Sequence, residues 1–443
     1  MSNPASTLTS IRWAAVFPWL ILVRAVRVSL MLRVIALALV GVVLTQAGWA
    51  LVDRLLGDYG NYPLIAQLTE MRLKETPAAL TVDNYEKLSL HVDAFGGPLM
   101  TGWYWPALPI IKLIHADAWQ PRLAYALAGA WSIAVWALFG GAIARIAALY
   151  LTHGETLGMV AAVRSALVKW PSTAGAPAGA LLGVFLVSLP LMFAGLLLRL
   201  DVFALLLGLL WIVVLIGGLA LAVLVIGLMF GWPLMWATVA VERTDAFDGI
   251  SRGYAYVYQR PLHAAFYVAV AGVLGLLAHW IVALFIQASF DATHWAVSAG
   301  SGERRLSELA SPSGVPLLAP PFQRGQAPRE TGEVNRRVNQ PGGSRLGMLE
   351  AAAGDSIRFW ETGWFWISKV FPMAYLFPAA TGIYLLLRRH IDSADVNDVT
   401  FDEGDPERGL PTLVNSPATG VPHVAGAPPA PSPTPADPSP PAP

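Results

Sequence analysis

The sequence predicts an all-α integral membrane protein, a helical bundle of about six transmembrane helices with cytoplasmic amphipathic elbow helices. Hydrophobic residues make up 55% of the 443 residues and charged residues only 13%, whereas soluble domains carry about 25% charged residues. Several stretches of about 20 residues carry no charge at all, which is the length a helix needs to cross a bilayer. Basic residues flank these stretches on alternate sides, as the positive-inside rule requires.

The apolar stretches set the predicted spans. They lie at residues 34–52, 123–144, 177–198, within 202–241, at 264–290 and at 364–387. The run 202–241 is unusual because 40 charge-free residues would form a helix of about 60 Å, twice the hydrocarbon thickness. Gly217 and Gly218 are the predicted hinge between a re-entrant or tilted segment and a true span. Two complete spans also fit this length and would make seven.

Charge distribution favours six spans over seven. Arginines without acidic residues precede the first span, basic residues occur in the predicted elbows at 145–176 and 242–263, and Arg388 and Arg389 follow the last span. With six spans all of these lie on the cytoplasmic side, whereas seven spans place the last elbow and the last flank outside. Both termini are therefore predicted to be cytoplasmic.

Composition assigns the remaining segments. They are a cytoplasmic N-terminal interfacial helix at 1–33, an outer loop at 53–122 that includes a segment lying on the outer leaflet, a partly disordered outer loop at 291–363 and a disordered Pro-rich cytoplasmic tail at 388–443.

Two predicted cytoplasmic loops resemble each other. Residues 140–170 and 231–261 each leave the membrane through an Ala/Ile/Val-rich helix, reach a glutamate, and enter a short helix that contains an arginine before a proline leads to the next span. One interpretation is an internal duplication of a span–elbow–span unit. Coincidence is the other, since the match is loose.

The second elbow holds the candidate site. Glu242, Asp245 and Asp248 are spaced by three and share one side of a helix, and Arg252 follows Asp248 by four. The functional interpretation is an inner-surface site for a cation or a phosphate headgroup. The structural interpretation, which we favour, is helix capping and an ordinary ion pair, worth a few tenths of a kcal/mol.

Two further residues are candidates because of their depth in the membrane. Arg145 ends the second span and could pair with Glu242 across the repeat, or extend to the interface as a simple anchor. His279 is the ionisable residue inside the fifth span, and an intramembrane ionisable group is a functional candidate. No His, Asp or Glu is expected at similar depth in another span, so a proton path or a metal site is not favoured.

Catalytic and cofactor motifs are missing from the sequence. There is no phosphate-binding Gly loop, His-Glu-x-x-His or Gly-x-Ser-x-Gly pattern, and no cysteine. We therefore expect no enzyme activity, no catalytic residues, no cofactor and no metal. The net charge of zero argues against a nucleic-acid partner.

Several blocks resemble a family of bacterial polytopic inner-membrane proteins without an assigned activity. These blocks are residues 17–30, 44–51, the FGGAIARIAAL block at 139–149, the WPLMWATVAVERTDAFDGISRGYAYVYQRP block at 232–261, and 385–405. The resemblance implies a multi-pass protein of the bacterial inner (cytoplasmic) membrane and implies no activity.

Three functional hypotheses follow. The first is a non-enzymatic scaffold or assembly component of a membrane complex, whose partners are the lipid bilayer and other membrane proteins. The second is a transporter or permease-like subunit, which needs a polar cavity near mid-membrane. The third is a membrane-embedded lipid-modifying enzyme that uses the acids between Glu242 and Asp248.

Reporter fusions test the six-span topology. We expect reporters fused at the N-terminus, within 242–263 and at the C-terminus all to report a cytoplasmic location, because these segments carry the basic flanks. A C-terminal fusion that reports the opposite side from the N-terminal fusion would favour seven spans.

Overall fold

The computed structural model describes residues 17–56, 92–116, 118–302, 345–395 and 399–400, with two short strands at 413–415 and 422–424. The chain divides into two compact units, Met1–Val399 and Thr400–Pro443. The first unit contains the described helices, and the second contains the strands.

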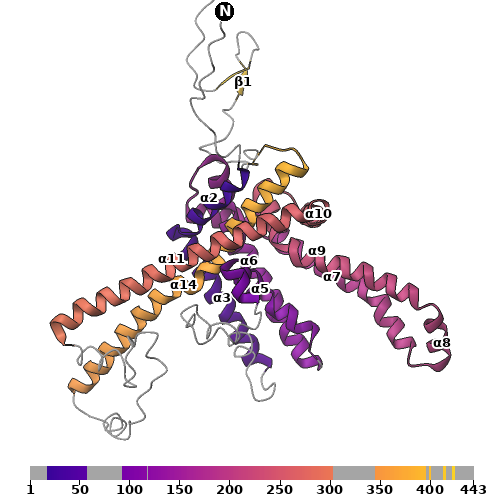
Figure 1. The fold of residues 1–443 in the computed structure, drawn as a ribbon, viewed down its shortest axis with the longest axis horizontal. Helices are drawn as coiled ribbons and strands as arrows, with labels where there is room; N and C mark the ends of the chain where they lie inside the picture. The colour runs from indigo at the N-terminus through magenta and orange to yellow at the C-terminus, as the bar shows by residue number, and fades with distance from the viewer. Residues whose placement is uncertain are drawn as a thin grey trace, which may run out of the picture. The chain divides into compact units, whose positions relative to one another are not determined.

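The first unit is built of helices (Figure 1). In chain order they are η1 (Pro18–Leu20), α2 (Ile21–Ser29), α3 (Leu32–Leu56), α5 (Val92–Ile114), α6 (Trp119–His153), α7 (Met159–Leu197), α8 (Asp201–Leu209), α9 (Trp211–Glu242), α10 (Ala246–Gln259), α11 (Pro261–Ser301) and α14 (Arg345–Ile391). Within the described residues, six helices are long and apolar enough to cross a membrane, namely α3, α6, α7, α9, α11 and α14. The predicted all-α membrane bundle is confirmed.

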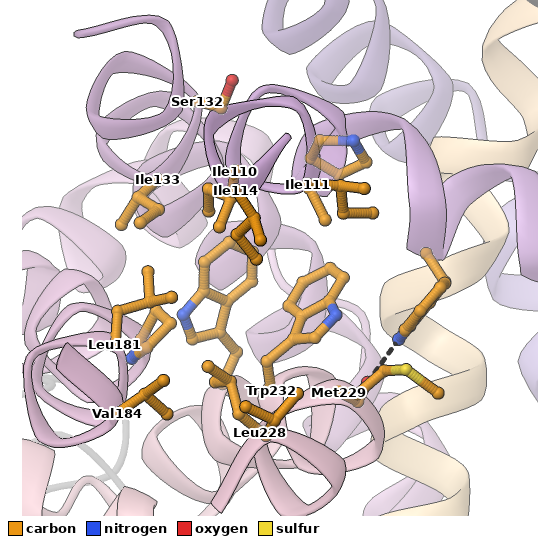
Figure 2. A pocket seen from close by; sticks show the side chains of 16 residues that line it. Ile110, Ile111, Ile114, Ser132, Ile133, Leu181, Val184, Leu228, Met229 and Trp232 are labelled. Atoms are coloured by element: carbon orange, nitrogen blue, oxygen red, sulfur yellow. Dashed lines mark hydrogen bonds between the residues drawn. The ribbon is translucent and has the colours of Figure 1, made fainter. Parts of the chain in front are cut away.

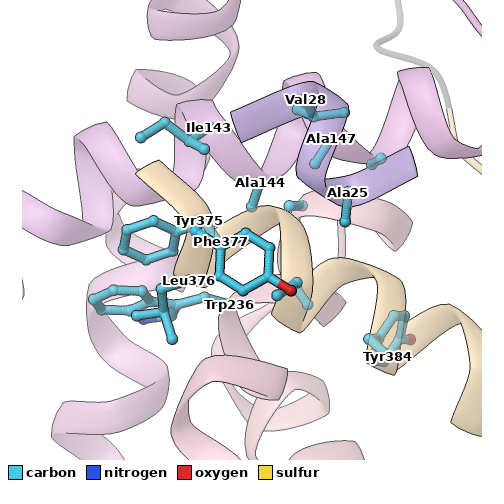
Figure 3. Packing of buried hydrophobic residues seen from close by; sticks show 14 of the residues in the cluster. Ala25, Val28, Ile143, Ala144, Ala147, Trp236, Tyr375, Leu376, Phe377 and Tyr384 are labelled. Atoms are coloured by element: carbon cyan, nitrogen blue, oxygen red, sulfur yellow. The ribbon is translucent and has the colours of Figure 1, made fainter. Parts of the chain in front are cut away.

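Helices α6 and α14 form the centre of the bundle. In their most apolar stretches 78% of the α6 residues and 100% of the α14 residues are buried, against 6% for α7 and for α9. Small side chains make this possible: Ala144 and Ala147 of α6 lie next to Ala25 and Val28 of α2 (Figure 3). Small residues at helix contacts let backbones approach closely, which is how helices associate in lipid.

One aromatic ring of α14 connects three helices. The Phe377 ring is stacked against Trp136 of α6, with ring centroids 5.5 Å apart, and against Trp236 of α9, at 5.8 Å. Gly140 leaves room for this ring, because a Cβ there would lie 2.4 Å from a carbon of Phe377. Aromatic pairs at such distances stabilise a core by about 0.5–1.5 kcal/mol each beyond area burial.

The expected N-terminal surface helix is α2. It buries Leu22, Ala25 and Val28 against the bundle and leaves Arg24 and Arg27 exposed. An amphipathic interfacial helix has apolar side chains on one side and charged side chains on the other, as α2 does. The first 16 residues of the predicted 1–33 segment lie outside the described residues.

Helix α5 differs from the expected outer-leaflet segment. It packs against α6, α11 and α14 and buries Leu99 and Leu108. At Gly102 a Cβ would lie 2.6 Å from the carbonyl oxygen of Pro372, so the absence of a side chain allows the two backbones to touch. The tryptophans of α5 therefore pack against the core of the bundle.

The long apolar run 202–241 breaks before the predicted hinge. Helix α8 ends at Leu209, α9 begins at Trp211, and α9 then passes through Gly217 and Gly218 without interruption. A Cβ at Gly217 would lie 2.9 Å from Leu191 of α7. This glycine thus serves close helix packing and does not bend the chain.

The two predicted elbows have different structures. The second is α10, a separate amphipathic helix as expected. The first is not separate: after the bend at residues 154–158, α7 begins at Met159 and continues through Pro171. Ala166 and Thr173 of α7 are buried beside α6. Packing against a neighbouring helix lets a membrane helix continue through a proline. The proposed duplication is therefore only approximate.

Helices extend into the predicted loop 291–363 and into the start of the predicted tail. Within the predicted loop 291–363, α11 extends to Ser301 and α14 begins at Arg345, while residues 303–344 lie outside the described residues. In the predicted disordered tail, α14 extends to Ile391, and β1 (Leu413–Asn415) pairs antiparallel with β2 (Pro422–Val424). Backbone pairing supplies this order despite the prolines nearby.

A glycine substitution tests the packing at Phe377. Gly140→Ala should lower stability by about 1–3 kcal/mol, because the new methyl group overpacks the ring contact. Thermal unfolding of the purified protein in detergent measures the effect. Gly183→Ala on α7 is the matched control, since nothing lies within 4 Å of its Cβ position, and it should be neutral or slightly stabilising. Equal melting temperatures for both variants would contradict the packing.

Candidate functional site

The strongest polar constellation in the described part of the chain is centred on Glu242, the last residue of α9. Its Oε1 accepts hydrogen bonds from Arg252 Nη1 of α10 at 2.6 Å and from the Tyr384 hydroxyl of α14 at 2.5 Å, and it forms an ion pair with Arg388 Nε of α14 at 3.0 Å. Its side chain is 9% exposed. The carboxylate thus joins the C-terminal ends of α9 and α14 to the middle of α10.

A second acid completes this constellation. The Tyr256 hydroxyl of α10 donates a hydrogen bond to Asp392 Oδ2, and Arg252 Nη1 lies 3.6 Å from the same oxygen. The Tyr256 and Tyr384 rings stack with centroids 5.4 Å apart. Burial and the hydrogen bond to Asp392 raise the pKa of the Tyr256 phenol above its ordinary value, so this group stays a neutral donor. We call these six residues the Glu242 cluster: Glu242, Arg252, Tyr256, Tyr384, Arg388 and Asp392.

The cluster is balanced in charge, with two arginines against two carboxylates. The balance matters because Glu242 lies at the C-terminal end of α9, where the helix dipole disfavours a negative charge. A buried carboxylate is tolerated when it is paired and hydrogen-bonded. With two hydrogen bonds and the ion pair to Arg388 on Oε1, Glu242 is a structural acceptor, and the arrangement does not resemble a free general base.

Two capping residues, Arg243 and Asp245, connect the end of α9 to the start of α10. Helix α9 ends because Arg243 adopts a left-handed conformation, with φ of 58°, and its side chain donates to the Ser165 carbonyl oxygen at 3.2 Å. Asp245 then caps α10 by accepting a hydrogen bond from the Asp248 backbone N–H at 2.9 Å. Both features turn the chain sharply, which brings Arg252 back to Glu242.

The structure brings only part of the predicted site together. Glu242 and Arg252 pair directly, whereas Asp245 is the helix cap and Asp248 is exposed. Arg145 is buried and donates to the Ala240 carbonyl oxygen at 3.0 Å, while Glu242 contacts Arg252, Arg388 and Tyr384. In the described ranges no three His, Cys, Asp or Glu side chains are grouped so that they could hold a metal ion.

His279 has a local partner inside the bundle. Its Nε2 lies 3.2 Å from the Ser368 hydroxyl of α14, and its ring stacks on Phe371 with centroids 5.5 Å apart. A second histidine of α11, His294, lies farther along the helix and contacts Glu361 of α14 at 2.7 Å. These two polar contacts join α11 to α14.

Sequence reasoning missed four members of the cluster. Arg388 was interpreted only as a basic flank, and Tyr256, Tyr384 and Asp392 were not singled out. Their separation from Glu242 along the chain, up to 150 residues, leaves no local pattern. One available signal was that Glu242 is the first acid after 40 charge-free residues, because such a carboxylate at a helix end needs cationic partners.

A cavity of about 210 Å³ lies between α5, α6, α7 and α9 (Figure 2). Apolar and aromatic side chains line it almost entirely, and Ser132 contributes a hydroxyl. That hydroxyl already donates to the Ala128 carbonyl oxygen at 2.9 Å and accepts from Trp49 Nε1 at 3.0 Å. The cavity therefore offers apolar surface and no polar path.

Comparison with known proteins found no matching family model, no matching curated protein and no matching solved structure.

Substitution of Glu242 tests whether the cluster is structural. Glu242→Ala leaves two arginines without their shared partner and should cost about 3 kcal/mol of stability, partly offset because Arg252 is one-third exposed. Thermal unfolding followed by tryptophan fluorescence measures this. Asp248→Ala, an exposed acid in the first turn of α10, is the matched control and should stay within about 0.5 kcal/mol of wild type. Equal losses in both variants would count against the cluster as the main constraint.

Proposed function

We propose that this chain is a non-enzymatic scaffold or assembly component of a membrane complex in the bacterial inner membrane, with both termini in the cytoplasm. The observation that carries the proposal is the hairpin formed by α7, α8 and α9. None of its residues from 181 to 226 is buried, although this segment is strongly apolar.

The hairpin extends beyond the helices of the bundle against which it packs. Helices α7 and α9 have 39 and 32 residues, or about 58 and 48 Å, against about 30 Å of hydrocarbon. They contact each other along one seam, and where they extend beyond the bundle their described neighbours are each other and α8 (Figure 1). The tilt of such a helix is set by the proteins packed against it, which supports a partner on this surface.

Open glycines lie along the same hairpin. At Gly183, Gly195, Gly208 and Gly218 none of the residues that the structure describes lies within 4 Å of the position that a Cβ would take. Small residues on a lipid-facing helix leave shallow notches into which a second helix packs. Large side chains such as Phe193 and Ile212 are 60% and 63% exposed and supply the contact area beside these notches.

The rival hypotheses have less support. A transporter needs a polar cavity near mid-membrane, whereas the cavity between α5, α6, α7 and α9 is apolar. Of the acids that a lipid-modifying enzyme could use, Glu242 accepts two hydrogen bonds and pairs with Arg388, and Asp245 caps a helix, which leaves only the exposed Asp248.

Site-specific photo-crosslinking in native membranes tests the proposal. A photoreactive phenylalanine analogue at position 193 or 212 should give one discrete protein adduct of the same mass increment, because both positions lie on the hairpin. The same analogue at Val43, which is 49% exposed on α3, is the matched control and should give no such adduct.

A second variant separates loss of contact from loss of folding. Gly218→Trp fills an open notch and should reduce the adduct several-fold while the melting temperature stays unchanged, since nothing in the chain contacts that position. Absence of any protein adduct from positions 193 and 212, with the protein migrating as a monomer after mild solubilisation, would overturn the scaffold proposal.

A further inference from the structure

Two histidines from different helices meet where α11 begins and α14 ends. The ring centroids of His263 and His390 lie 5.3 Å apart, and the Tyr267 hydroxyl lies 2.8 Å from His390 Nε2. Arg260 precedes His263 by one helical turn, and Arg389 directly precedes His390. All four basic residues are exposed. We call them the basic patch: Arg260, His263, Arg389 and His390.

The basic patch has no acidic partner in the described part of the chain. No ion pair there joins any of its four residues to a carboxylate. The neighbouring acids are already paired. Glu242 contacts Arg252 and Arg388, and Asp392 Oδ2 lies 3.6 Å from Arg252 Nη1. Two permanently charged guanidinium groups and two imidazoles of the patch therefore receive no counter-charge from the described residues.

Helix dipoles explain one half of the basic patch and oppose the other half. Arg389 and His390 belong to the last turn of α14, where the negative end of the helix dipole favours a cation. Arg260 and His263 lie at the start of α11, where the positive end disfavours a cation. Arg260 is the N-cap residue of α11, and its side chain makes no capping hydrogen bond. An anion beside Arg260 and His263 would offset this repulsion.

The charges of the basic patch also decide between a metal ion and an anion. Two neighbouring imidazoles can serve as metal ligands, but Arg260 and Arg389 repel a divalent cation. The described residues also contain no group of three metal-binding side chains. Guanidinium groups bind phosphate oxygens, often through two parallel hydrogen bonds, and an imidazole N–H can donate to the same oxygens. The chemistry of the patch therefore fits a phosphate group.

Apolar side chains beside the basic patch indicate the source of the phosphate. Leu262 and Phe266, in the first two turns of α11, are 82% and 51% exposed. Helices α11 and α14 are both long and apolar enough to cross a membrane, so the patch lies at the end of two such helices. A lipid whose headgroup contacts the patch can place its hydrocarbon against Leu262 and Phe266, whereas a free phosphate ion leaves both side chains uncovered. Basic sites between membrane helices recognise anionic lipid headgroups.

We propose that the basic patch binds the phosphodiester headgroup of an anionic phospholipid. In this arrangement Arg260 and Arg389 pair with the phosphate oxygens, and His263 and His390 donate hydrogen bonds from their rings. The inference is independent of the scaffold proposal, because the patch belongs to α11 and α14, whereas the hairpin is formed by α7, α8 and α9.

Lipid titration of the full-length purified protein in detergent tests the site. Native mass spectrometry measures the dissociation constant of the first bound phosphatidylglycerol and that of phosphatidylcholine with the same acyl chains. The choline group adds a positive charge that the two arginines repel. We expect phosphatidylglycerol to bind at least about tenfold more tightly, since each arginine near a headgroup strengthens binding about fivefold.

Charge-matched variants locate the binding. Arg260→Gln and Arg389→Gln should each weaken phosphatidylglycerol binding about fivefold. Because both side chains are exposed, the melting temperature without added lipid should stay unchanged. Arg164→Gln removes an exposed arginine of α7 and makes the same change in net charge. It is the matched control and should leave binding unchanged.

Three outcomes would overturn the proposal. The first is equal affinity for phosphatidylglycerol and phosphatidylcholine, and the second is an equal loss of binding in Arg164→Gln and in the two patch variants. The third is displacement of phosphatidylglycerol by excess inorganic phosphate, which would identify free phosphate as the ligand. None of these results bears on the crosslinks expected from positions 193 and 212.

Discussion

The charge of Glu242 is the constraint around which one end of the bundle is organised. This carboxylate ends a helix whose dipole disfavours it, and it lies among apolar spans where an unpaired charge is not tolerated. Two arginines and a tyrosine from α10 and α14 therefore converge on a single oxygen, Oε1. The position of α10, the end of α14 and the turn at Arg243 all follow from satisfying that one group.

Packing in the rest of the bundle depends on size complementarity, because the hydrophobic effect does not draw helices together inside lipid. Glycines and alanines sit opposite large rings: Gly140 faces Phe377 and Gly275 faces Tyr375. Phe377 in turn stacks between Trp136 and Trp236. The interior is thus a dry core of aromatic and small residues, and the tryptophan-lined cavity lies where the α7–α9 hairpin leaves the bundle.

That interior bears directly on function. The charged groups of the Glu242 cluster are paired with one another, and the tryptophan-lined cavity is apolar. The apolar hairpin formed by α7, α8 and α9 has no buried residue between 181 and 226, and this surface is the basis of the scaffold proposal.

The sequence by itself determined the fold class and the spans. Charge-free stretches of sufficient length predicted six membrane-crossing helices, the spacing around Asp245 predicted the capped helix α10, and Glu242 and Arg252 were both chosen as site residues, because all of these depend on local composition and spacing. Tertiary structure decided that α5 enters the bundle, that α7 continues through Pro171, and that α9 passes its glycines unbroken. It also brought Tyr384 and Arg388 to Glu242, and Asp392 to Tyr256 and Arg252. Those features arise from contacts between residues far apart in the chain, where packing overrides the local preference of proline and glycine and where a buried charge selects its partners.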